Sequence, residues 1–185
     1  ALVHDGVPED DARARCWLMD THGLVTRHRI DTLADFKRPF AHDHDPIADL
    51  ATAVRRLRPT ALIGASGQGG AFTPEVLRAM KEATARPLIM ALSNPTDQSE
   101  CTAEAAYAHT DGTAVFASGS PFPPVTVGGR ARVPGQANNA YIFPGVGLGI
   151  LACGARRVTD EMFFAAARAL SGTVSGDDLA VERIY

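Results

Sequence analysis

Residues that could contact a ligand follow three apolar runs of the sequence. Asp20 comes directly after residues 16–19, the glycine-rich string GASGQGG occupies residues 64–70, and Asn94 follows residues 88–92. A carboxylate can accept hydrogen bonds from ribose hydroxyls, glycines let a backbone approach a ligand closely, and a side-chain amide can bond a carboxylate or a carboxamide. Because open parallel sheets bind ligands at the carboxyl ends of their strands, these positions are the first candidates for a binding site.

Each of these positions also has a purely structural interpretation. Many strands end in Asp because its side chain favours turns, and Pro95 restricts Asn94 in a way that suits an Asx-turn. GASGQGG is not a dinucleotide fingerprint, because Phe72 stands where G-x-G-x-x-G needs its last glycine. It also departs from G-x-S-x-G by having Gln68 at the final position, and the sequence indicates no base partner for Ser66 as a nucleophile. The residues alone leave both interpretations open.

A long irregular segment holds further polar candidates. Residues 119–144 contain several prolines that exclude regular helix, and long irregular segments in compact α/β domains are commonly functional. Gln136, Asn138 and Asn139 could contact a polar ligand or could simply satisfy loop backbone. The string HDHD at residues 42–45 contains metal-ligand types, but consecutive side chains rarely converge on one ion, and we expect Asp45 to cap a helix. We therefore expect no metal site in this chain.

The elements that would position these residues follow from apolar periodicity. Short β-rich runs alternate with amphipathic stretches, which is typical of a parallel sheet with crossover helices. Asp45 and Pro46 predict the start of a helix whose apolar face continues to Pro59. The glycines at 145–149 predict a helix that packs closely against a neighbour. We expect strands at 16–20, 61–65 (buried), 88–92 and 114–117, helices from 8, 45, 73, 102, 145, 159 and 175, and a hairpin over 125–133.

Composition and charge argue against several classes of protein. The chain has 185 residues, and its 18 basic and 21 acidic residues are scattered, so no basic stripe indicates nucleic-acid binding. No apolar run approaches the roughly 18 residues that a membrane-spanning helix needs, and the first residues do not have the pattern of a signal peptide. Cys16, Cys101 and Cys153 form no C-x-x-C pair. This cysteine pattern fits a reducing compartment, and we expect the cytoplasm.

Five segments of the sequence resemble malic enzymes, the decarboxylating malate dehydrogenases. They are FKRPFAHDHDP, LIGASGQGGAFTPEV, ALSNPTDQSECTAEAAY, FASGSPFPPV and VPGQANNAYIFPGVGLGILACGARRVTDEM. The resemblance runs from about Arg15 to Tyr185 and is greatest to the large-subunit, NADP-using branch. It implies an α/β fold with a Rossmann-like, doubly wound, mainly parallel sheet that is incomplete at the N-terminus.

The resemblance also implies a reaction and a set of contacts. Malic enzymes oxidise malate with NADP or NAD and a divalent metal, Mg or Mn, and release pyruvate and CO2. By motif, Asn94 in SNPT and Asn138 in QANN correspond to amides that contact malate, with Asn139 beside the second. Asp20 corresponds to the carboxylate on the adenosine ribose, and Gly64, Ala65 and Ser66 correspond to the loop over the dinucleotide.

Lys37 falls where the resemblance places the residue that discriminates between the two cofactors. A cation there would neutralise the 2′-phosphate of NADP, which Asp20 would otherwise repel. Arg27, Arg29 and Arg38 add positive charge nearby. A solvated basic loop is the simpler alternative, and we expect a preference for NADP over NAD.

The resemblance finally implies that residues 1–185 are a fragment, a partial NAD(P)-binding domain. No strand followed by G-x-G-x-x-G precedes Cys16, and the family's catalytic tyrosine, catalytic lysine and acidic metal ligands lie upstream of Ala1. We expect the opening strand, the pyrophosphate loop and the N-terminal domain to be absent, and the fragment alone to be inactive. The intact enzyme is expected to be a homo-oligomer with no nucleic-acid or membrane partner. The alternative is a non-catalytic dinucleotide-binding or assembly module.

Overall fold

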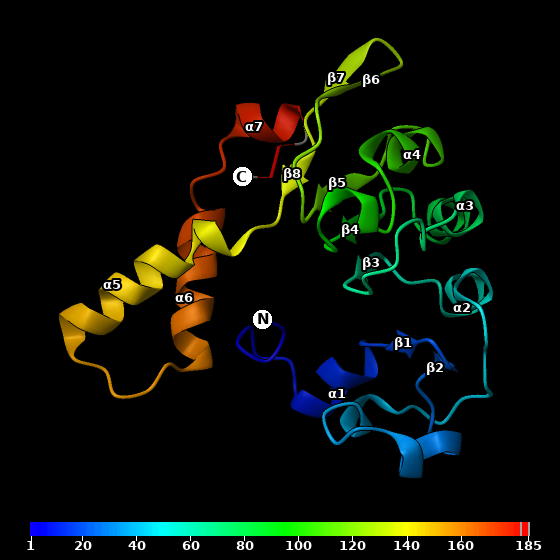
Figure 1. Ribbon diagram of the computed structural model, residues 1–185, viewed down its shortest axis with the longest axis horizontal. Coiled ribbons are helices and arrows are strands. Elements are labelled where there is room, and N and C mark those ends of the chain that lie inside the picture. Colours follow the sequence, from blue (N-terminus) through cyan, green and yellow to red (C-terminus); the bar gives the residue numbers. More distant parts are fainter. Residues whose placement is uncertain (182, 185) are drawn as a thin grey trace. The chain divides into compact units, whose positions relative to one another are not determined.

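A four-stranded parallel sheet forms the centre of residues 60–185 (Figure 1). Its strands run in the order β3-β4-β5-β8, and each neighbouring pair is parallel. Gly64 lies opposite Ala91, and Ala91 lies opposite Ser118, so the carboxyl ends of β3, β4 and β5 lie side by side. The bounds are β3 Ala61–Gly64, β4 Leu88–Ala91, β5 Val115–Ser118 and β8 Gly135–Gln136. The predicted α/β class with a parallel sheet is confirmed.

The structure is a computed structural model that describes residues 1–181, 183 and 184. The chain divides into two units, Ala1–Pro59 and Thr60–Tyr185. Within the described residues, no helix is long and apolar enough to cross a bilayer.

Two helices cross over between the first three strands of the sheet. Helix α3 (Pro74–Ala83) is capped by Thr73 and helix α4 (Ala103–Ala108) by Thr102, each through a hydroxyl that accepts a backbone N–H. Both helices lie on the same side of the sheet (Figure 1), as crossovers of one hand that step in one direction along a parallel sheet require. Their buried faces confirm the predicted helices, and Leu77, Met80 and Tyr107 are fully buried.

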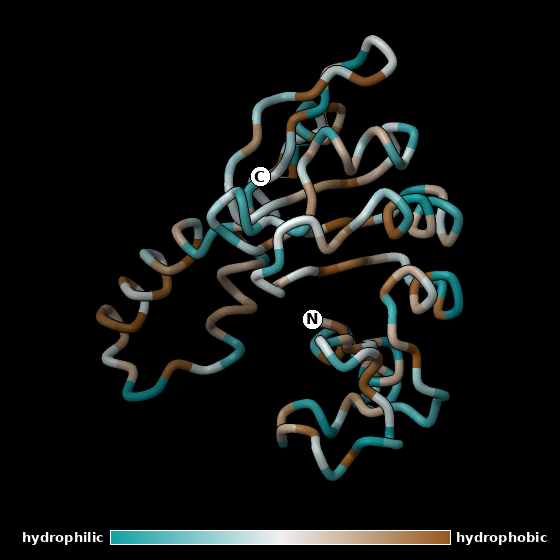
Figure 2. The backbone as a smooth tube through the Cα atoms, turned by 45° about the vertical axis from the view of Figure 1, so that its right-hand side comes forward, coloured by the Kyte–Doolittle hydropathy of each residue, from teal (hydrophilic) through white to brown (hydrophobic). Residues whose placement is uncertain are grey.

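The sheet of this unit has a hydrophobic interior and a more exposed edge strand. Hydrophobic colour follows the central strands in Figure 2, and Ile89 and Phe116 are fully buried. Strand β3, which we expected to be buried, has no second partner strand within the described residues, and 62% of Ile63 is exposed. The expectation failed because an apolar run does not distinguish a central strand from an edge strand.

The remaining elements of this unit lie in the connection from β5 to β8 and after β8. Strands β6 (Val125–Val127) and β7 (Arg130–Arg132) form the predicted hairpin, with Gly128 and Gly129 at positive φ in the turn. Helices α5 (Phe143–Cys153), α6 (Asp160–Ser171) and α7 (Gly176–Ala180) come next, and Ser175 caps α7 as predicted. The expected close packing at the α5 glycines is not observed, because nothing in the described residues lies within 4 Å of an added Cβ at 145, 147 or 149.

Residues 1–59 form a smaller unit of short elements. Helix α1 (Glu9–Ala14) leads to β1 (Met19–Asp20) and β2 (Gly23–Leu24), which pair with each other in antiparallel fashion. The 3-10 turns η1 (Arg27–Thr32) and η2 (Arg38–Phe40) precede helix α2 (Leu50–Leu57). The predicted strand over 16–20 is thus a short hairpin arm, because the turn at Thr21-His22 folds the chain back on itself before a long strand can form.

Helix α2 begins later than we predicted. Its N-cap is Asp49, whose carboxylate accepts a hydrogen bond from Thr52 N at 2.8 Å, and not Asp45. Residues 46–49 remain outside the helix, and the carbonyl of Ile47 there accepts a hydrogen bond from Leu24 N at 2.8 Å. In a helix that began at residue 46, the Ile47 carbonyl would accept a hydrogen bond from within the helix, but here it accepts one from β2. The side chain of Ile47 packs with Leu24 and is not part of the apolar face of α2.

Candidate cofactor and substrate sites

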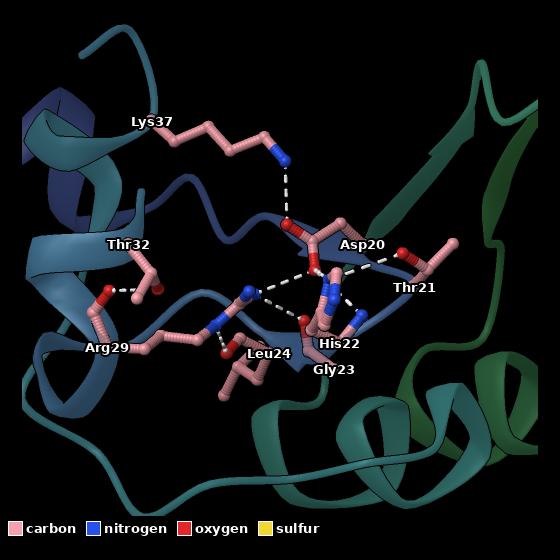
Figure 3. A network of polar contacts seen from close by, with 8 residues as sticks. All are labelled: Asp20, Thr21, His22, Gly23, Leu24, Arg29, Thr32 and Lys37. Atoms are coloured by element: carbon pink, nitrogen blue, oxygen red, sulfur yellow. Dashed lines mark hydrogen bonds and ion pairs between the residues drawn. The ribbon is translucent and has the colours of Figure 1, made fainter. Parts of the chain in front are cut away.

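Asp20, at the end of β1, is held by two cationic side chains (Figure 3). Lys37 Nζ lies 2.6 Å from Asp20 Oδ2, and Arg29 Nη2 lies 2.9 Å from Asp20 Oδ1. The backbone N–H of His22 donates to the same Oδ1 at 3.0 Å. The expected proximity of Lys37 and Asp20 is therefore present in the structure, although the two residues are 17 positions apart in the sequence.

Arg29 is fixed by more than its pairing with Asp20. Its Nη2 donates to the Gly23 carbonyl at 2.9 Å and its Nε to the Leu24 carbonyl at 3.2 Å, so the guanidinium spans the β1–β2 turn (Figure 3). Asp20, Arg29 and Lys37 line a cavity of about 440 Å³ together with His22, Thr32, Leu33 and Ala34. The cavity thus has a carboxylate and two cations at its wall.

The charges at this cavity favour an anionic ligand group. Burial opposes ionisation of Asp20, but hydrogen bonds from Lys37 and Arg29 outweigh it and hold the pKa of Asp20 well below its ordinary value. With Asp20 ionised, its pairing with two cations leaves one positive charge in excess. Such a wall can accept a phosphate through the cations and a ribose hydroxyl through the carboxylate.

A buried carboxylate, Glu100, lies beneath the ends of β3 and β4. Its side chain is fully buried and accepts hydrogen bonds at Oε1 from Ser66 N and Ser66 Oγ, both at 2.8 Å, and from Ser93 Oγ at 2.5 Å. Ser93 N donates to Oε2 at 3.2 Å. Burial opposes ionisation, but the hydrogen bonds from Ser93 and Ser66 outweigh it, so the pKa of Glu100 lies below its ordinary value.

Gly64 is required by this carboxylate. An added Cβ at Gly64 would lie 2.6 Å from Glu100 Cδ and 2.7 Å from Phe72 Cζ, which is closer than real contacts allow. The glycine at the end of β3 therefore makes room for a buried side chain of this same chain.

The glycine-rich loop after β3 uses its amides internally. Ser66 N donates a hydrogen bond to Glu100, Gly67 N to Ser93 Oγ at 2.8 Å, and Gln68 N to Ser66 Oγ at 3.1 Å. Both hydroxyls in turn donate to Glu100, so the buried carboxylate orders all three amides directly or through a serine. Ala65 and Ser66 remain exposed at the loop surface.

The candidate amides follow the carboxyl ends of strands in the four-stranded sheet. Asn94 follows β4, is exposed, and lies against Gly119, where an added Cβ would be 3.3 Å from its Nδ2. Asn138 follows β8 and is exposed, with its Oδ1 accepting a hydrogen bond from Ala140 N at 2.9 Å. Asn139 is exposed beside it. Residues 64–66, Asn94 and Asn138 thus all lie at or after the carboxyl ends of strands of one sheet, whereas Asp20 and Lys37 belong to the other unit.

Glu100 was not predicted from the sequence, and Arg29 had no specific predicted role. Glu100 lies in the string SECTAE, between a predicted loop and a predicted helix. Nothing in the sequence there distinguishes a buried glutamate from a solvent-exposed one. Arg29 was only part of a basic cluster. The histidine of residue 42 has partners other than a metal. His42 Nε2 is hydrogen-bonded to the Cys16 carbonyl at 2.8 Å, and the His42 ring stacks on Trp17. No three potential ligand side chains converge among residues 1–181, 183 and 184.

Comparison with known proteins finds relatives that match nearly the whole chain and share one kind of name. The chain is 54% identical to the NADP-dependent malic enzyme of Vitis vinifera and 54% identical to NADP-dependent malic enzyme 1 of Arabidopsis thaliana, over 96% and 95% of its length. It is 51% identical to the chloroplastic NADP-dependent malic enzyme of Solanum lycopersicum over 94% of its length. These matches cover 30% of each relative, so the chain spans about a third of the curated relatives it matches.

The expected cytoplasmic location is contradicted by these relatives. Proteins from Solanum lycopersicum, Flaveria pringlei and Flaveria trinervia, 51 to 53% identical to this chain, are named chloroplastic. The expectation was wrong because unpaired cysteines indicate a reducing environment and do not specify which compartment provides it.

The family comparison covers every residue of the chain. The model of the family "Malic enzyme, NAD binding domain" matches residues 1–185, which agrees with the parallel α/β sheet and with the polar residues that follow its strands. The chain therefore belongs to the malic enzyme NAD-binding domain family.

Proposed function

We propose that this chain is part of the NADP-binding domain of a longer malic enzyme, which oxidises malate and decarboxylates the product to pyruvate and CO2. The observation that carries the proposal is the family match over residues 1–185, with relatives that are named NADP-dependent malic enzymes. The opening strand, the pyrophosphate loop and an N-terminal domain would come from other parts of that longer protein. The chain alone would then be inactive, and the intact enzyme a homo-oligomer.

The cofactor contacts are assigned to both units of the chain. Asp20 would accept hydrogen bonds from the adenosine ribose, and Lys37 would pair with the 2′-phosphate that distinguishes NADP from NAD. The excess positive charge at the cavity of Asp20, Arg29 and Lys37 supports this assignment. Ala65 and Ser66 would lie against the dinucleotide, and Gly64 would let their loop sit on Glu100. NADP, when bound, accepts the hydride from malate.

The substrate contacts are assigned to side-chain amides that follow the carboxyl ends of the strands. Asn94 and Asn138, with Asn139 beside it, would donate hydrogen bonds to the oxygens of malate, which suits exposed side-chain amides with N–H donors. As the resemblance to malic enzymes implies, the Mg or Mn ion of the reaction would be held by acidic residues outside this chain. Among residues 1–181, 183 and 184, no three ligand side chains converge.

The cofactor assignment is tested by Lys37→Ala in the longer enzyme. We expect kcat/KM for NADP to fall about tenfold because a charged contact to the phosphate is lost, while kcat/KM for NAD changes less than about twofold. Lys37→Arg should retain most of the NADP preference. Steady-state kinetics with malate and each dinucleotide measure both values.

Arg27→Ala is the matched control, because Arg27 is exposed and does not line the cavity. If Arg27→Ala and Lys37→Ala reduce NADP use equally, a general basic surface and not the Lys37 position determines the preference. If the longer protein binds NADP but shows no malate-dependent reduction of it, the non-catalytic dinucleotide-binding module replaces the enzyme as the better interpretation.

A further inference from the structure

We propose that Glu100 is a positioning residue that holds the cofactor loop (residues 64–70) and the substrate loop (residues 93–96) in one fixed arrangement. This inference rests on the proposed function, because the two loops are named by the contacts assigned to them above. Glu100 itself is fully buried, so we do not assign it a direct ligand contact. Its effect on the reaction would pass through Ser66 and Ser93.

The hydrogen bonds form a closed connection between the two loops. Glu100 accepts from the backbone and the side chain of Ser66, 34 residues earlier, and from the backbone and the side chain of Ser93, seven residues earlier. Ser93 Oγ in turn accepts a hydrogen bond from Gly67 N at 2.8 Å. Neither loop can move away from Glu100 without breaking bonds to a buried charge, which cost more than ordinary hydrogen bonds.

The backbone around Glu100 secures the far end of the cofactor loop. Phe72 N donates to the Glu100 carbonyl at 2.9 Å, and Gly70 N donates to the Ser99 carbonyl at 3.0 Å. An added Cβ at Gly69 would collide with the carbonyl of Asp97. The loop therefore follows the segment 97–100 along its length, and the side chain of Glu100 fixes its beginning.

The chemistry of the donors requires a carboxylate at this position. All four hydrogen bonds come from backbone N–H groups and hydroxyls, which are neutral, and they converge on the two oxygens of Glu100. A glutamine has one acceptor oxygen and a donor NH2 group, so one N–H of the network would face another donor. The substitution keeps the volume of the side chain but leaves Ser93 N facing an NH2 group. Because Ser93 Oγ accepts a hydrogen bond from Gly67 N, a shift of Ser93 would also displace the cofactor loop.

The test is Glu100→Gln in the longer enzyme, with KM for NADP and KM for malate measured separately. Because Ser66 adjoins the dinucleotide contact and Ser93 adjoins Asn94, we expect both KM values to rise about five- to tenfold. A merely structural role predicts a different result, since a smaller folded fraction lowers the apparent kcat and leaves both KM values unchanged. Glu104→Gln, on an exposed face of α4, is the matched control and should change neither KM.

Ser93→Ala provides a second variant should Glu100→Gln not fold. It retains the buried carboxylate but removes the hydroxyl that joins Glu100 to Gly67, and we again expect both KM values to rise. The inference is overturned if a folded Glu100→Gln or Ser93→Ala enzyme keeps both wild-type KM values, or if only one KM changes in both variants. An inactive wild-type enzyme would instead contradict the proposed function, so the two failures are distinguishable.

Discussion

Asp20 and Glu100 are two ionised carboxylates that the molecule stabilises in opposite ways. Asp20, with 20% of its side chain exposed, is paired with the cations of Lys37 and Arg29. Glu100 is fully buried and is bonded by neutral amides and hydroxyls of Ser66 and Ser93. In both cases the pKa of the carboxyl lies below its ordinary value, but the groups responsible differ in how freely they can move.

The difference indicates what each region can do. A lysine on a flexible stem can turn from Asp20 to a ligand phosphate by changing rotamers, so the first region can adjust its charge pairing when a ligand binds. Backbone amides cannot turn without moving the chain, so the region around Glu100 fixes loop positions. The first region is suited to recognising charge, and the second to holding geometry.

Gly64→Ala should have the largest effect on stability. The added methyl group would overlap Glu100 and Phe72 and could be accommodated only by displacing the buried carboxylate from its donors. Overpacking of this kind costs about 1–3 kcal/mol, and we expect the upper end because hydrogen bonds to a charge are also disturbed. Urea denaturation of the chain measures the free energy of unfolding.

Gly147→Ala is the control for that substitution. Gly147 lies inside α5, and nothing in the described part of the chain is within 4 Å of an added Cβ. Alanine is a better helix former than glycine, so this variant should be more stable by about 0.5–1 kcal/mol. Equal destabilisation by both substitutions would show that close approach to Glu100 is not what makes Gly64 necessary.

Much of the fold could be predicted because its signals are local. Prolines and threonines at helix starts and the Gly-Gly turn mark α3, α4 and the β6–β7 hairpin correctly. The start of α2 was wrong because Asp45 and Asp49 are both acceptable caps, and a bond between Leu24 and Ile47 decides between them. That contact joins residues far apart in the sequence, which periodicity does not show.

The candidate cofactor residues were predicted from the resemblance to malic enzymes, because Lys37 lies 17 positions from Asp20 and no sequence pattern joins the two. In the structure their charged groups lie 2.6 Å apart. Glu100 could not be found in this way, because its partners Ser66 and Ser93 are common loop residues and burial is a property of the folded chain. The roles of Asn94 and Asn138 in binding stay predictions.

Asp20→Asn should cost less than Gly64→Ala and should depend on salt. We expect a loss of about 1 kcal/mol at low ionic strength, because charged pairs near the surface contribute little more than that. The loss should shrink by about half at 0.5 M NaCl, since salt screens partly exposed charges. The loss caused by Glu100→Gln should change little with salt. Urea denaturation at both ionic strengths checks the contrast.

Acid provides a second way to compare these carboxylates. A group whose pKa is lowered by folding stabilises the folded chain above its ordinary pKa, and this contribution is lost as pH falls below it. For Asp20 the loss should begin near pH 3.8, its ordinary value, and continue downward. Asp20→Asn should therefore show less acid destabilisation than wild type. Asp35→Asn, at a residue whose side chain is 94% exposed, is the matched control for removing one carboxylate, and an equal effect of both substitutions would contradict the prediction.

The smallest expected effect is a change in the reactivity of Cys101, which adjoins Glu100. Burial, and then the charge of Glu100, raise the pKa of the Cys101 thiol to about 12, so Cys101 should react with iodoacetamide at pH 8 far more slowly than the exposed Cys16. Glu100→Gln removes the charge but leaves the burial, and we expect Cys101 to react about threefold faster. Mass spectrometry of each cysteine peptide measures the two rates in one sample, with Cys16 as the internal control. If Cys101 became as reactive as Cys16, the substitution would have opened the site, and the neutral donors around Glu100 would be holding the fold together as well as the loops.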